Sequence, residues 1–503
     1  MSSLKNKYEQ YLKEMQQIGD YNHAIALLHW DAEVNAPSKG AQFRTQQITT
    51  LSAASHNLST SDTLGQILED LYAVRQQLTA EECRNIELSL EDYRKATKLP
   101  TTFVRNFATA RAEAYQAWIA GRRANDFQLF APALAKLIDL QREKTKLMGF
   151  SDHPYNALLD EYEQSATVAQ LDPLFKQIRE ELVDFAKELR EKGQPTDNSF
   201  LSANYPHKAQ WDFGVELLKN MGYDFGAGRQ DVSEHPFTVT FSPLDVRVTT
   251  RISEDNPMSM IGTCVHEGGH ALYEQGLPAA QYGLPLGAAV SLGIHESQSR
   301  LWENNVGLSR GYWSQHLPAF KAAFPEQVGD RDLDTFYKAI NQVAPNFIRV
   351  EADELHYHLH VLIRYEIEKG LIEGSIEVAD LDKVWNAKYK EFLGVDVPDA
   401  ARGVLQDVHW CEGLMGYFPT YSLGSFYAAQ FYRQACIDIP TLEAEIAAGD
   451  SSQLLNWLRQ HIHVHGRALS PTELCVKATG EPLNVRYFLD YARKKYRQIY
   501  GIS

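Results

Sequence analysis

The sequence predicts a mainly α-helical protein with one small β-sheet. Apolar residues recur every three or four positions through most of the chain, which is the period of an amphipathic helix. Between His235 and Ile252 the period changes to two, which is typical of a β-hairpin or two short strands. With 503 residues, 44% of them hydrophobic, the chain can bury a large core. It has no repeat of fixed period and no low-complexity tract. Its length suits two or three ordinary domains or one large domain with lobes, and we expect a single domain over residues 1–503.

Helical patterns dominate as far as about residue 230. Apolar residues between Leu4 and Ile18 predict a long opening helix, which the segment from His29 to Pro37 is expected to break. A helix is also predicted from Leu134 to Leu147. Another is predicted to begin at Asp172-Pro173 and to end before Gly193 and Pro195, where the chain is most linker-like.

The predicted hairpin alternates on both sides of a turn at Ser242-Pro243. Phe237, Val239 and Phe241 precede the turn, and the alternation resumes at Val246. An edge strand at this point could hold an extended peptide by main-chain hydrogen bonds. A hairpin that only connects helices would show the same period, so both interpretations stay open.

A helix is predicted next, from Asn256 to Gly276. Asn256 suits the helix cap, Pro257 suits the first turn, and Gly276 is a plausible stop. Within it lies His266-Glu267-Gly268-Gly269-His270. Residues four apart share a helix face, so His266 and His270 can bind one metal ion, and Glu267 can act on a water molecule there. Each glycine costs a helix about 1 kcal/mol, which favours a site that another backbone or a substrate approaches closely.

A catalytic zinc site needs a third protein ligand. Glu296 is the best candidate, because a helical pattern follows it and 26 positions after His270 is a reasonable reach for an antiparallel neighbour. His295 is the competing ligand and Glu303 a weaker one.

Helical patterns return from about residue 296 to the end. Clear runs are Leu355 to Ile372, Leu381 to Leu393 and Leu454 to Ile462. Two histidine clusters lie in or near these runs, and we interpret both as structural or surface features: His356, His358 and His360; His461, His463 and His465.

Composition excludes several classes of protein. The net charge of −16 argues against a nucleic-acid or anionic-membrane partner. Five scattered cysteines without CxxC spacing argue against a disulfide framework. No apolar signal segment and no stretch of about 18 apolar residues is present, so we expect a cytoplasmic protein with no membrane partner.

Six short motifs, in order, resemble the carboxypeptidase Taq family, the thermostable carboxypeptidase 1 type of zinc metallocarboxypeptidase. They cover about residues 235 to 425: His235-Pro236-Phe237; Asp245-Val246-Arg247-Val248-Thr249; His266-Glu267-Gly268-Gly269-His270; His295-Glu296-Ser297-Gln298; Ile348-Arg349-Val350-Glu351-Ala352-Asp353; Gly403-Val404-Leu405-Gln406-Asp407-Val408-His409-Trp410. The N-terminal segment departs from the family. Where a Thr and a Met-Pro should follow Trp30-Asp31, this chain has Val34 and Ala36-Pro37.

The resemblance implies a helical metallopeptidase fold similar to neurolysin and angiotensin-converting enzyme, with a deep groove between two lobes. It implies His266, His270 and Glu296 as metal ligands and Glu267 as general base. It further implies a homodimer that removes single residues from peptide C-termini with broad preference, using Zn²⁺ or, as a substitute, Co²⁺.

The remaining roles are assigned from the chemistry that the reaction needs. The oxyanion needs a donor besides the metal, and Tyr421 is favoured over Tyr417. A free C-terminal carboxylate suits a guanidinium, and Arg349 is the candidate, although an ion pair with Glu351 or Asp353 would also explain it. His235 is a candidate substrate contact, or a turn residue.

Three further residues of these motifs are given structural interpretations. Arg247 is expected to pair with Asp245. Asp407 and His409 are expected to form a carboxylate–histidine support or a packing network.

Two rival functions remain: an oligopeptidase or dipeptidyl-carboxypeptidase on the same scaffold, and a peptide-binding protein without activity. The intact Glu267 argues against the second.

Overall fold

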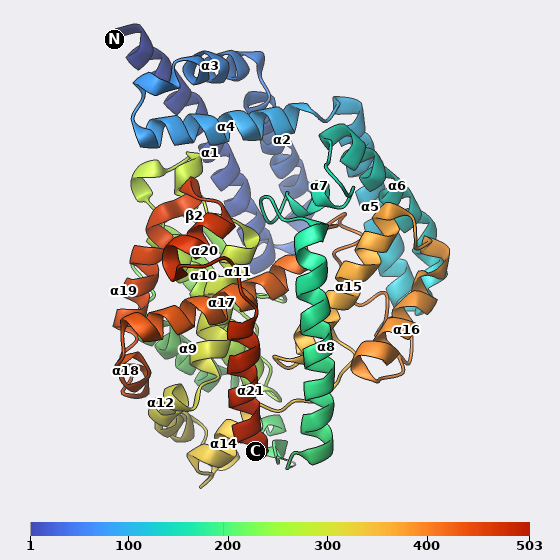
Figure 1. Cartoon of the computed structure of the whole chain (residues 1–503), viewed down its shortest axis with the longest axis vertical. Helices are drawn as coiled ribbons and strands as arrows, with labels where there is room; N and C mark the ends of the chain where they lie inside the picture. The colour runs from blue at the N-terminus through green and yellow to red at the C-terminus, as the bar shows by residue number, and fades with distance from the viewer. Residues whose placement is uncertain (1, 195, 503) are drawn as a thin grey trace.

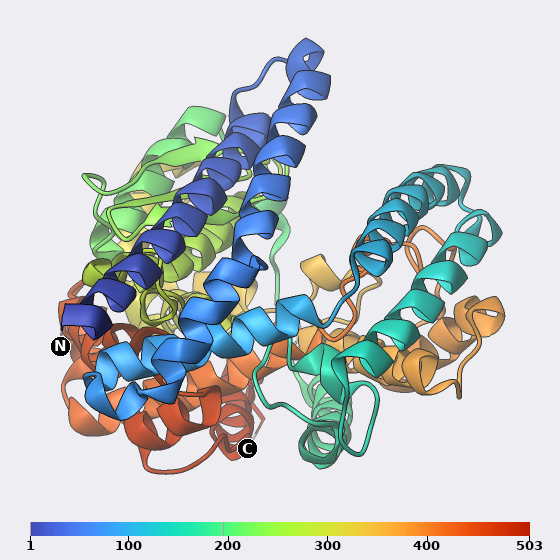
Figure 2. The ribbon, with the colours of Figure 1, turned by 90° about the horizontal axis from the view of Figure 1, so that it is seen from above.

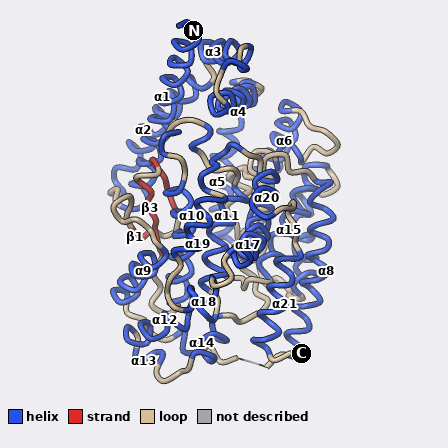
Figure 3. Tube along the Cα trace, turned by 60° about the vertical axis from the view of Figure 1, so that its left-hand side comes forward, coloured by secondary structure: helices blue, strands red, loops and turns tan. Residues whose placement is uncertain are grey.

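The structure, a computed structural model, describes residues 2–194 and 196–502 and is mainly helical with one three-stranded sheet (Figures 1 and 3). The α-helices of the first half are α1 (Ser2–Val34), α2 (Ala41–Ser59), α3 (Asp62–Ala73), α4 (Ala80–Thr97), α5 (Thr101–Ala124), α6 (Ala131–Met148), α7 (Asn156–Leu159), α8 (Val168–Lys192) and α9 (His207–Met221). After the sheet come α10 (Pro257–Gly276), α11 (Leu292–Arg300), α12 (Arg310–Ala323), α13 (Pro325–Val328), α14 (Leu333–Ile340), α15 (His356–Glu373), α16 (Leu381–Leu393), α17 (Pro419–Asp438), α18 (Leu442–Ala447), α19 (Ser452–His461), α20 (Pro471–Thr479) and α21 (Arg486–Tyr500).

The opening helix is longer than predicted. It passes through His29-Trp30-Asp31 without a break and ends at Val34, three residues before Pro37. Trp30 is buried with the Arg247 guanidinium 4.4 Å from its ring, and Asp31 pairs with Arg44 of α2 at 2.6 Å. These tertiary contacts keep the segment helical, so the expected break lies at its end.

Helix α8 begins four residues before the predicted Asp172. Thr167 and Gln170 form a capping box, which fixes the start of the helix at Val168. Pro173 therefore lies inside the helix, in its second turn. The helix ends before Gly193 as predicted, and Pro195 lies outside the described residues.

The sheet contains the predicted hairpin and one strand that was not predicted. Strands β2 (Thr238–Ser242) and β3 (Asp245–Thr250) are antiparallel, and β1 (Gln230–Val232) adds to β3 in parallel, which gives the order β1-β3-β2. β1 has three residues, too few for its period to be seen in the sequence. β2 is thus an edge strand, and the sheet packs beside α10 (Figure 3).

Two hydrophobic clusters of unequal size hold the helices together. The larger runs from Ala110 to Tyr500 and includes α10, α15 and α17. The smaller consists of residues from α1, α3 and α4 together with Leu284. Seen from above, the α1–α2 hairpin and the α5–α6 hairpin stand as separate arms (Figure 2). The predicted groove between two lobes stays a prediction.

Two predictions made from composition can be compared with the described residues. None of the helices in this part of the chain is both long enough and apolar enough to span a membrane. All five cysteines lie within this part of the chain and are free.

Candidate metal centre

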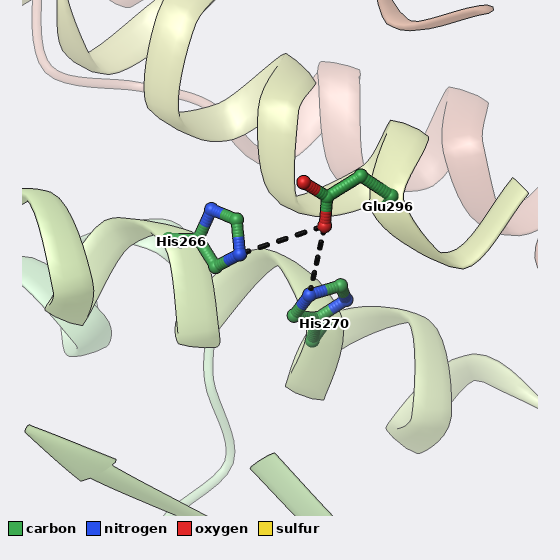
Figure 4. A group of neighbouring side chains, drawn as sticks. All are labelled: His266, His270 and Glu296. Carbon is green, nitrogen blue, oxygen red and sulfur yellow. Dashed lines mark ion pairs between the residues drawn. The ribbon is translucent and has the colours of Figure 1, made fainter. Parts of the chain in front are cut away.

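Helices α10 and α11 bring the three predicted ligand residues together. Asn256 caps α10 through a bond from Ser259 N of 3.3 Å, and Pro257 opens the helix, as predicted. His266 and His270 then lie one turn apart on the face that meets α11 (Figure 4). Glu296 Oε2 lies 3.6 Å from His266 Nε2 and 3.4 Å from His270 Nε2.

Glycines allow α11 to approach its neighbours closely at this point. A Cβ on Gly269 would lie 2.6 Å from Gln298 O and 2.7 Å from Ser299 Cα, which are backbone atoms of α11. A Cβ on Gly424 of α17 would lie 2.5 Å from Glu296 Cγ. We expected the glycines of α10 to allow a substrate or another backbone to approach closely. Gly269 confirms this, because the backbone of α11 lies against it. Gly268 instead faces the side chains of Leu218 and Met221.

Glu303, the weaker candidate ligand, contacts the far side of His266. Its Oε2 lies 2.8 Å from His266 Nδ1, whereas the Nε2 of this imidazole faces Glu296. Glu303 belongs to a π-helical segment, Leu301–Gly307, which continues α11. Such segments are rare and shift the register of side chains at functional sites. Arg300 bridges the two acids, with 2.8 Å to Glu296 and 3.0 Å to Glu303.

His295, the other candidate, contacts the far side of His270. The two Nδ1 atoms are 2.5 Å apart, and His295 Nε2 lies 2.8 Å from Glu274 Oε1. Both competing candidates are thus neighbours of a proposed ligand and point at its second ring nitrogen. Sequence spacing could have indicated Arg300, which lies four residues after Glu296 and pairs with it. Glu274 instead contacts His295, 21 residues away, and no helical spacing indicates that pair.

The donor set fits a divalent metal. Two imidazole nitrogens and one carboxylate oxygen, within 4.8 Å of one another, form a set that zinc accepts in catalytic sites. Burial lowers the pKa of His266, but Glu296 and Glu303 outweigh it and raise that pKa to about 9, so the site stabilises positive charge. Burial and His295 lower the pKa of His270 to about 3, which keeps this imidazole neutral as a ligand must be.

Glu267 lies beside the cluster and is tied to the edge strand. The Thr238 hydroxyl of β2 donates to Glu267 Oε2 at 2.7 Å and contacts the main-chain oxygen of the same residue at 3.0 Å. The side chain is buried, and burial raises the pKa of the Glu267 carboxyl. The base candidate is therefore oriented by the hairpin that the sequence predicts.

Both candidate tyrosines lie in one aromatic group near Glu296. The rings of Tyr417 and Tyr421 are 5.3 Å apart, and the Tyr421 hydroxyl lies 3.1 Å from His409 Nε2. Burial raises the pKa of Tyr421 well above its usual value, so its hydroxyl keeps its proton. Tyr421 lies three residues before Gly424 on the same face of α17, and Gly424 contacts Glu296.

Arg349 pairs with a partner other than the two that were considered. Its Nε and Nη2 donate to Asp407 Oδ1 at 3.2 and 2.9 Å, and Nη1 donates to Tyr357 at 3.0 Å. Arg364 donates to Asp407 Oδ2 at 2.7 Å. Asp353 instead pairs with His356. Asp407 is thus a largely buried carboxylate between two arginines, neither of which was expected as its partner. His409, the expected partner, has its Nδ1 4.0 Å from Asp407 Oδ1.

The remaining predicted residues lie at the margins. His235 is exposed in a bend before β2, and its carbonyl accepts from Ser233 at 2.7 Å. Arg247 pairs with Asp245 at 2.9 Å, as predicted.

The residues of the 356–360 cluster are buried and hydrogen-bonded to neighbouring side chains, which confirms a structural role: His356 to Asp353, His358 to Ser422 and His360 to Tyr389.

The chain matches known proteins over nearly its whole length. A family model described as Carboxypeptidase Taq (M32) metallopeptidase matches residues 10–496. Thermostable carboxypeptidase 1 of Thermus thermophilus is 40% identical, over 98% of this chain and 99% of the relative. Carboxypeptidase 1 of Bacillus subtilis is 38% identical over 98% of each.

A solved structure agrees with these matches. The M32 carboxypeptidase from Deinococcus radiodurans R1 superposes with a TM-score of 0.96 at 38% identity, covering 99% of this chain and 100% of that one. The fold, the family model and the curated relatives therefore agree. The chain belongs to the carboxypeptidase Taq (M32) family and is a metallocarboxypeptidase, a hydrolase that acts on peptide bonds.

Proposed function

We propose that this carboxypeptidase is zinc-dependent and releases single amino acids from peptide C-termini with broad preference. His266, His270 and Glu296 are the proposed ligands, and Co²⁺ is a possible substitute metal. The observation that carries the proposal is the convergence of these three side chains from two helices, with buried Glu267 beside them. When bound, the metal supplies Lewis acidity to the peptide carbonyl and to water.

Glu267 is the proposed general base. Its carboxylate takes the proton of the attacking water and passes it to the leaving amine. Burial, which raises the pKa of Glu267, makes it a better base than an exposed carboxylate. The bond from Thr238 at 2.7 Å holds Oε2 and leaves Oε1 for water.

Tyr421 is the proposed donor to the oxyanion, because its raised pKa keeps the hydroxyl protonated. His409, at 3.1 Å from that hydroxyl, orients it. The edge strand β2 offers an extended peptide main-chain partners next to Glu267. His235, in the exposed bend that precedes β2, is proposed to contact the substrate.

Arg349 is the proposed carboxylate clamp. A guanidinium has five N–H groups, and three of them make the contacts to Asp407 and Tyr357. The two that take no part in these bonds can receive a substrate carboxylate. The ion pair with Asp407 supports this role, because it fixes the guanidinium before substrate arrives.

The test compares a short peptide bearing a free C-terminus with its C-terminal amide, using zinc-loaded protein and mass analysis of the products. Stepwise loss of single residues from the free acid alone supports the proposal. Loss of dipeptides, or internal cleavage of both peptides, would overturn it in favour of an oligopeptidase. Cleavage of neither peptide by protein with bound zinc would leave only a binding function.

The proposed assembly is a homodimer in the cytoplasm. The dimer is proposed from the family, and the cytoplasmic location from the five scattered cysteines, all of which are free. Light scattering after size exclusion should give twice the 57.0 kDa chain mass, and the chain mass itself would contradict the dimer.

A further inference from the structure

His270 contacts a chain of two further residues that have no role in the proposal above. His270 Nδ1 lies 2.5 Å from His295 Nδ1, and His295 Nε2 lies 2.8 Å from Glu274 Oε1. All three side chains are largely buried. Glu274, His295 and His270 therefore form one hydrogen-bonded series that ends at Nε2 of His270, 3.4 Å from Glu296.

We propose that Glu274 and His295 are positioning residues that act in series to fix the tautomer in which His270 presents Nε2 to the metal. The inference rests on the metal centre proposed above. It concerns how the chain prepares one imidazole of that centre before a metal binds.

The direction of the hydrogen bonds follows from the chemistry of each group. A carboxylate only accepts, so the His295 nitrogen that faces Glu274 must carry a hydrogen. In the tautomer of His295 that carries its hydrogen on Nε2, Nδ1 has no hydrogen and can only accept. The facing Nδ1 of His270 must therefore donate, and the lone pair of His270 lies on Nε2, which points toward Glu296.

The other tautomer of His295 is unfavourable at both of its ring nitrogens. With the His295 proton on Nδ1, a lone pair on Nε2 would face the Glu274 carboxylate at 2.8 Å. His270 would then carry its proton on Nε2, where it would block the metal. Glu274 thus selects the tautomer of His270 that can bind the metal, although it contacts only His295.

His266 provides an internal comparison. Its Nδ1 contacts the Glu303 carboxylate directly at 2.8 Å, with no imidazole between them. A carboxylate therefore orients each histidine. Glu303 contacts His266 directly, whereas Glu274 acts on His270 through His295. The effect of Glu274 on metal affinity must depend on residue 295, and that dependence separates the proposed series from a general structural role.

The experiment is a double-mutant cycle read by zinc affinity, measured on the full chain by competition with a chromophoric chelator. Glu274→Ala and His295→Ala should each weaken zinc binding by roughly 10- to 100-fold. His295→Asn should stay within about threefold of the parent, because its Oδ1 takes the place of Nδ1 as acceptor. In the His295→Asn background, Glu274→Ala should have no further effect.

A matched control exists at a similar pair. His153 Nε2 and Glu373 Oε2 are also 2.8 Å apart, and neither residue belongs to α10 or α11. Glu373→Ala should leave zinc affinity unchanged.

Two results would overturn the inference: zinc affinity within twofold of the parent in both Ala variants at 274 and 295, or an equal loss from Glu274→Ala in both backgrounds. A parent protein that binds no zinc would instead overturn the metal centre itself.

Discussion

Replacing one of the two adjacent glycines of α10 by alanine should weaken metal binding, and replacing the other should not. A Cβ at position 269 would lie 2.6 Å from Gln298 O, a backbone atom of α11. Restoring ordinary van der Waals contact requires α11 to withdraw by about 0.8 Å, and metal ligands tolerate only about 0.2 Å. Because Glu296 moves with α11, Gly269→Ala should lower zinc affinity by roughly tenfold or more, which equals about 1.4 kcal/mol.

The neighbouring position is the matched control. A Cβ at position 268 would lie 2.7 Å from Leu218 Cδ2 and 2.9 Å from Met221 Cε, which are ends of side chains that can move. Both substitutions gain about 1 kcal/mol of helix propensity. For Gly269→Ala, overpacking of about 1–3 kcal/mol opposes that gain, so only this variant should lose stability.

The assay is chelator competition for zinc, combined with urea unfolding of the metal-free proteins. Gly268→Ala should bind zinc like the parent and be equally or more stable. Equal zinc affinities for the two variants, or weaker binding by Gly268→Ala, would refute the claim that close packing of α11 sets the position of Glu296.

Five other substitutions test the proposed roles and the ion pairs of Asp407. Glu267→Gln should lower kcat by roughly 10²- to 10⁴-fold with full zinc content; unchanged turnover would exclude it as the base. Tyr421→Phe should lower kcat by roughly 10²- to 10³-fold, and a larger loss in Tyr417→Phe would transfer the role. Arg349→Met should remove most of the preference for a free acid over its amide in kcat/KM, and a preserved ratio would place the clamp elsewhere. Asp407→Asn leaves two buried guanidinium groups uncompensated and should cost about 3–5 kcal/mol in urea unfolding. Burial raises the pKa of Asp407, but the flanking arginines hold it well below its usual value. This stabilisation is therefore present above about pH 4 and is lost only as the pH falls further.

Local pattern was enough to predict the helix that carries the motif. The cap at Asn256, the stop at Gly276 and the spacing of the two histidines all depend on neighbours within a turn or two. The pairing of Arg247 with Asp245 was predictable for the same reason, because residues two apart share one side of a strand. In each case the interaction lies within the reach of sequence periodicity.

The outer contacts of the site depend on distant parts of the chain and could not be predicted in this way. Asp407 meets Arg349 across 58 residues, and no periodicity indicates that pairing. Glu303 reaches His266 through a π-helical turn, whose altered register an α-helical pattern does not anticipate. Tertiary contacts around Trp30 extended α1 beyond its expected end.

The most direct test of the central claim is anomalous diffraction at the zinc edge from crystals of the zinc-loaded protein. We expect one peak about 2.0–2.2 Å from His266 Nε2, His270 Nε2 and a carboxylate oxygen of Glu296. A peak coordinated by His295 or Glu303, or no peak between α10 and α11, would contradict the proposed metal centre.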